Sequence, residues 1–176
     1  PTSLTQDGIT SEELMVIKKP PLETVGINSV LNASKDTFLD DRFVCFAYRW
    51  KYSNNEYSAI SQFSAPSFTP SLFSYNYSTG LNDGMLNKTN SCQITYKSGG
   101  KLVVGIDLLW KDMQTGNIRV IDKLNKSELG LVDNTDFTYT FDSSKIFTVL
   151  PDSEILRLYD NVPRLAKAQT VMGNRL

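Results

Sequence analysis

The residues that could carry out chemistry in this chain are carboxylates and two thiols, because the sequence contains no histidine. That absence removes the commonest general base and transition-metal ligand, and it rules out Ser–His and Cys–His nucleophile pairs. The closely spaced carboxylates are Glu12–Glu13, Asp40–Asp41 and Asp133 with Asp136. The run from Asp133 to Asp136 lacks the spacing and the glycine of a calcium loop, and Asp40–Asp41 is typical of a solvated pair. We therefore expect no enzyme, no catalytic residues, no metal and no cofactor.

The two thiols, Cys45 and Cys92, are 47 positions apart, and each lies in or beside an apolar, strand-like run. No C-x-x-C spacing is present, so the sequence does not support a zinc or redox site. A disulfide between two sheets of a sandwich is one alternative. Two buried free thiols are favoured, because an isolated cysteine behaves as a small hydrophobe.

Composition places the chain among globular proteins: of 176 residues, 40% are hydrophobic and 21% charged, with a net charge of -1. A near-neutral chain without a basic run is not expected to bind nucleic acid specifically. No apolar run approaches the roughly 20 residues of a membrane span. We expect residues 1–19 to be a lead-in linker, 20–150 a β-sandwich domain and 151–176 the start of a following element or domain. Both ends suggest a piece of a longer polypeptide; a trimmed small protein is the alternative.

The elements that must position any site are predicted to be strands. Large apolar side chains alternate along residues 42–52, which predicts a central sandwich strand, and residues 56–63 are predicted to return beside it as a β-hairpin. Gly105 in mid-strand predicts a bulge or a close backbone approach. Further strands are expected at 22–31 (an edge strand), 92–96, 101–111, 118–123, 138–141 and 146–150, with a helix beginning near 152. The pattern predicts an all-β, immunoglobulin- or fibronectin type III-like β-sandwich with a long loop insert and short flanking segments.

The insert, residues 64–90, combines turn-forming residues with eight large apolar side chains. One interpretation is a long loop packed over the end of the sandwich; the other is an exposed surface for a partner. Exposed aromatic rings at these positions could also stack on sugars, as in a carbohydrate-binding or adhesin module. The candidate partner contacts are Phe68, Phe73, Tyr75, Tyr77 and Trp110.

Two stretches, Phe46–Tyr52 and Glu56–Ser61, resemble a fibronectin type III hairpin. Together with Leu156–Pro163 and Gly173–Arg175, they resemble the tail stabilisation, or muzzle-type, structural proteins of crAss-like (podovirus-like) phages. The resemblance runs from Ile9 to Leu176 and implies one module of a much longer, non-enzymatic chain. It implies a virion protein of the phage tail or nozzle, on the DNA exit path, that forms a homo-oligomeric ring and contacts neighbouring tail proteins. A fibronectin type III domain is shorter than residues 20–150, and the insert would be the excess.

Overall fold

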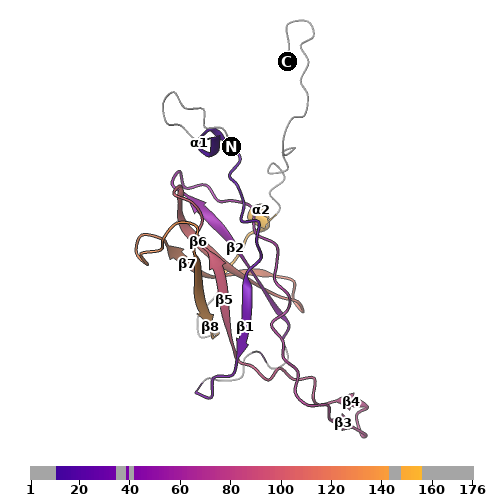
Figure 1. Ribbon diagram of the computed structural model, residues 1–176. Coiled ribbons are helices and arrows are strands. Elements are labelled where there is room, and N and C mark those ends of the chain that lie inside the picture. The colour runs from indigo at the N-terminus through magenta and orange to yellow at the C-terminus, as the bar shows by residue number, and fades with distance from the viewer. Residues whose placement is uncertain (1–10, 35–38, 40–41, 143–147, 156–176) are drawn as a thin grey trace, which may run out of the picture.

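The computed structural model describes residues 11–34, 39, 42–142 and 148–155, and its sheets are all antiparallel (Figure 1). The all-β prediction is therefore confirmed. The elements are α1 (Ser11–Leu14), β1 (Gly26–Val30), β2 (Val44–Tyr52), β3 (Tyr75–Asn76), β4 (Leu81–Asn82), β5 (Ser91–Lys97), β6 (Val103–Asp112), β7 (Ile118–Asn125), β8 (Asp136–Phe141), β9 (Thr148–Val149) and α2 (Asp152–Ile155).

Two sheets enclose the core. One has the order β1-β5-β8 and the other β2-β6-β7-β9, while β3 and β4 form a separate pair. Consecutive strands β1 and β2 lie in different sheets, whereas the first two strands of an immunoglobulin domain share one. The prediction for Gly105 is confirmed: the β2–β6 register shifts beside it, and a Cβ there would lie 3.2 Å from the Leu124 carbonyl oxygen.

The core is built from the alternating side chains of facing strands. In β2 the inward residues Phe46, Tyr48 and Tyr52 are at most 2% exposed, so the predicted aromatic stripe is confirmed as core. Phe141 of β8 belongs to the other sheet, and its ring packs edge-to-face against that of Phe46 with the ring centroids 5.2 Å apart. Burial of each such side chain contributes about 1.5–3 kcal/mol, so this stripe anchors one sheet against the other.

Two expectations about the strongest segment are wrong. β2 is an edge strand of its sheet, not a central one. Residues 56–63 do not form its hairpin partner: apart from a single bridge between Lys51 and Tyr57, they contain no strand. The edge of β2 is instead covered by a segment outside the strands that has a serine at every third position.

We call Ser58, Ser61 and Ser64 the serine ladder. Their backbone N–H groups donate to the carbonyls of Trp50, Tyr48 and Phe46, respectively, at 2.8 or 2.9 Å. Their hydroxyls accept from the N–H groups of the same three β2 residues at 3.0 or 3.1 Å, and then donate to the carbonyl of the next residue in the segment. Each serine thus satisfies both outward backbone groups of one β2 residue, as a neighbouring strand would.

The ladder explains why this segment is not a strand. Three residues of the segment lie beside every two residues of β2. Two strand residues span about 6.7 Å, so the segment advances only about 2.2 Å per residue. The same period places Ile60 and Phe63 over the outer face of the sheet, where they pack against a second cluster that includes Leu109 and Leu150. Along this segment, every third side chain therefore lies at the edge of β2, and every third lies over the outer face of the sheet.

The two cysteines are free and buried, and they lie in different sheets, Cys45 in β2 and Cys92 in β5. The favoured alternative of two buried thiols is confirmed. Burial raises the pKa of both thiols above the ordinary value, which favours the protonated form.

Candidate functional site

The insert forms an arm that projects away from the two sheets (Figure 1). We define the arm as residues 69–88. Its two limbs are joined at the base by the Lys88 N–H, which donates to the Thr69 carbonyl at 2.7 Å, and by the Asn87 carboxamide, which accepts from the Thr69 N–H. Farther out, β3 and β4 pair, and the limbs approach so closely that a Cβ at Gly84 would overlap the Leu72 carbonyl.

Polar side chains fix the shape of the arm from within. The Asn82 carboxamide oxygen accepts from the N–H groups of Ser74 and Gly84, which ties one limb to the other. At the tip, the carboxamide oxygen of Asn76 accepts from the backbone and the hydroxyl of Ser78. These amides hold turns, so the arm keeps a defined shape although it lies outside the core.

Large apolar side chains cover this shape and face solvent. Tyr77 is 92% exposed, Leu72 83% and Phe73 77%. The other exposed members are Tyr75, Leu81, Met85 and Leu86, and the rings of Tyr75 and Tyr77 meet edge-to-face at 5.0 Å. The arm carries only two charged residues, Asp83 and Lys88. An ordered surface rich in aromatic groups and poor in charge has the composition of an interface core.

The structure places the five predicted contacts in three environments. Phe73, Tyr75 and Tyr77 lie together on the arm and are exposed. Phe68 lies just before the base, partly buried against Phe43 with ring centroids 4.6 Å apart. Trp110 has to be corrected: its side chain is 0% exposed because it lies on the inward face of β6, so it offers no surface to a partner.

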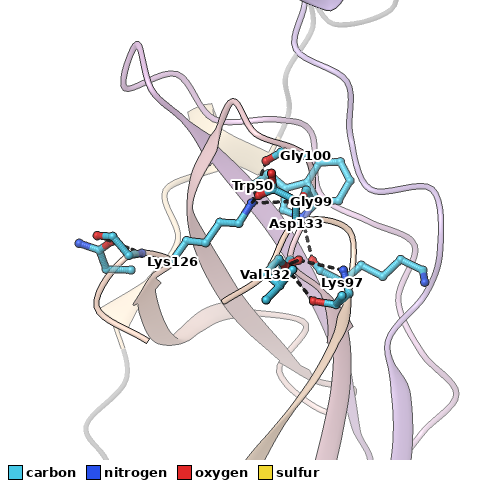
Figure 2. A network of polar contacts seen from close by, with 11 residues as sticks. Trp50, Lys97, Gly99, Gly100, Lys126, Val132 and Asp133 are labelled. Atoms are coloured by element: carbon cyan, nitrogen blue, oxygen red, sulfur yellow. Dashed lines mark hydrogen bonds and ion pairs between the residues drawn. The ribbon is translucent and has the colours of Figure 1, made fainter. Parts of the chain in front are cut away.

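Asp133 and Asp136, two of the carboxylates considered for chemistry, are engaged in structural contacts. Asp133 accepts from the ammonium of Lys126 at 2.5 Å, and the same ammonium donates to the carbonyls of Gly99 and Gly100 (Figure 2). Asp136 pairs with Lys97 at 3.1 Å. Asp40 and Asp41 lie outside the described residues. The Lys126 contacts therefore fasten two loops at the end of the sandwich, where the Trp50 indole N–H also donates to the Lys97 carbonyl.

A buried ion pair on the outer face of the four-stranded sheet was not expected from the sequence. Arg49 and Asp107, each 2% exposed, are joined by two N–H donors of the guanidinium to one carboxylate oxygen at 2.9 and 3.0 Å. Glu154 of α2 accepts from the same guanidinium at 2.6 Å, and the Tyr57 ring stacks on it at 4.0 Å. Burial raises the pKa of Asp107, and Arg49 opposes that effect. The pair ties α2 and the covering segment to the sheet.

No other feature in the described residues forms a convincing chemical site. A shallow hollow of about 310 Å³ beside Lys101 and Leu131 contains Lys126 and Asp133, which already bind one another. A second, of about 180 Å³, lies over Gly105 and adjoins the Asp107 ion pair. Within the described part of the chain, no group of three or more acidic or thiol side chains could hold a metal, and no helix is long and apolar enough to cross a membrane.

Comparisons with protein-family models, with curated proteins and with solved structures found no match to this chain. The arm is therefore the candidate site on the strength of its own geometry.

Proposed function

We propose that this chain is a non-enzymatic structural module that makes protein–protein contacts through its arm. The observation that carries the proposal is the exposure of Leu72, Phe73 and Tyr77 on an arm whose backbone is fixed by its own hydrogen bonds. A preformed apolar surface loses little conformational entropy on binding, which favours tight association.

The assembly that we propose is the tail or nozzle of a crAss-like phage, in which the chain joins copies of itself and neighbouring tail proteins in a ring. The support for this part is the sequence resemblance, and a fibronectin type III-like ancestry belongs to the same proposal. An arm with almost no charge fits a protein surface better than the phosphates of the DNA that passes through such a tail.

A carbohydrate-binding or adhesin module is the alternative. The tip offers exposed tyrosines, but the amides of Asn76 and Asn82, which could bind sugar hydroxyls, are used to hold the arm together. The inward position of Trp110 removes the largest ring that this alternative needed.

The test is to place a photo-crosslinking amino acid at Tyr77 in the assembled source particle. The expected product is a covalent adduct with a protein, either another copy of this chain or a neighbour, and the same probe at exposed Gln93 should give little adduct. If Tyr77 gives no protein adduct while the isolated chain binds members of a glycan array, the alternative replaces this proposal.

A further inference from the structure

Strand β8 is at one edge of the three-stranded sheet, and no described strand pairs with its outer side. Ser98 donates its N–H to the Thr135 carbonyl at 3.0 Å, and the Ser91 hydroxyl donates to the Phe141 carbonyl at 3.2 Å. The carbonyls of Thr135 and Phe141 therefore both point toward β5. Alternate residues of a strand direct their N–H and C=O groups to opposite sides. The backbone groups of Asp136, Thr138 and Thr140 therefore point away from the sheet, and in the described part of the chain none of them is bonded.

Side-chain burial also ends abruptly at this edge. Phe137 and Tyr139 point toward the core but are only half-buried, whereas Phe141 of the same strand is 2% exposed. In the other sheet, by contrast, Phe46 and Tyr48 of edge strand β2, whose outer side is covered by the serine ladder, are at most 1% exposed. A further strand beside β8 would cover the half-buried aromatic rings as it bonded the outward backbone groups.

The described residues show none of the usual protection at the β8 edge. Edge strands are normally blunted by Pro, Lys, a bulge or a covering segment. The ladder covers β2, and β9 pairs with β7 at Arg119 and Val120. β8 has six residues rich in threonine and aromatic groups, and its only charge is Asp136.

We propose that β8 pairs antiparallel with β8 of a second copy of this chain, which joins the two three-stranded sheets into one continuous sheet. This contact is separate from the arm and goes beyond the proposed function.

A second copy suits the edge because the strand is complementary to itself. A two-fold axis through Thr138 places that residue opposite its own copy and places Asp136 opposite Thr140 of the second copy. No like charges then meet, and threonine pairs across strands are favourable. Two-fold contacts of this kind are the commonest in homo-oligomers.

The test measures the dimerisation constant of the full chain by sedimentation equilibrium, in a background that carries F73S and Y77S so that the arm does not contribute. T138K should weaken dimerisation by at least about tenfold, because it places like charges across the axis. T140K should leave it unchanged or strengthen it, because the new cation faces Asp136 of the second copy. Q93K is the matched control, since Gln93 is exposed on the outer face of the same sheet but in its central strand.

Hydrogen exchange gives a second readout that does not depend on a variant. The amides of Thr138 and Thr140 should exchange more slowly as the protein concentration rises, and the circular dichroism of every variant should match that of the parent. The proposal is overturned if the parent stays monomeric at all concentrations, or if T138K and Q93K weaken association equally. A monomer whose β8 amides are protected only by an added foreign strand would also overturn it.

Discussion

Replacement of Phe73 and Tyr77 by serine in the F73S/Y77S variant is expected to abolish assembly while the fold remains intact. Both side chains are more than three-quarters exposed in the isolated chain, so their loss should change the free energy of unfolding by less than about 0.5 kcal/mol. Aromatic anchors at the centre of an interface commonly contribute 2 kcal/mol or more each. Together they should weaken association with the partner by about a thousandfold.

The measurement is incorporation of the variant into the particle, or its affinity for the crosslinked partner, beside a thermal unfolding curve. L22S is the matched control, because Leu22 is 76% exposed but lies outside the arm. L22S should assemble like the parent. Normal assembly of F73S/Y77S would mean that the arm is not the contact surface.

The second large effect is expected at the serine ladder. The triple variant S58A/S61A/S64A removes the hydroxyls that accept from three backbone N–H groups of β2. Each buried donor left without an acceptor costs about 1–3 kcal/mol, so the free energy of unfolding should fall by more than about 3 kcal/mol. The variant should also aggregate, because β2 would then present unpaired N–H groups at a sheet edge.

Urea unfolding measures the loss, and light scattering measures the aggregation. S53A/S71A/S74A is the control: it removes three hydroxyls that make no hydrogen bond in the described structure. A loss of equal size in the two triple variants would show that the ladder's hydroxyls do not stabilise the edge.

The alternation of apolar and polar side chains along the sequence predicts which residues form strands and which face of each strand is buried. It does not predict which strands lie side by side. The period-two stripe in β2 identifies its buried face correctly, because a strand with one apolar face must place that face in the core. It carries no information on which neighbour lies beside the strand, so β2 was expected to be central and is an edge. Trp110 alternates with Ile106 and Leu108 on the same face of its strand. That shared face predicts a core position for Trp110 better than its place near the strand's end predicts exposure.

The serine ladder was missed because its signal has a period that neither helix nor strand uses. Serines at 58, 61, 64 and 67 stand in a region already rich in serine, where they resemble ordinary turn composition. The Arg49–Asp107 pair was missed for a different reason: the residues are 58 positions apart and meet only through the β2–β6 register. Phe73, Tyr75 and Tyr77 were named as candidate contacts because a solvated loop does not usually carry so many large apolar side chains. The structure shows that they are exposed, and their contact with a partner stays a prediction.

The measurement that tests the central claim most directly is the mass and assembly state of the component that carries this chain, by native mass spectrometry or cryo-electron microscopy of the intact source particle. We predict an oligomeric component in which Leu72, Phe73 and Tyr77 lie against another protein. A monomer whose arm remains exposed to solvent would contradict it.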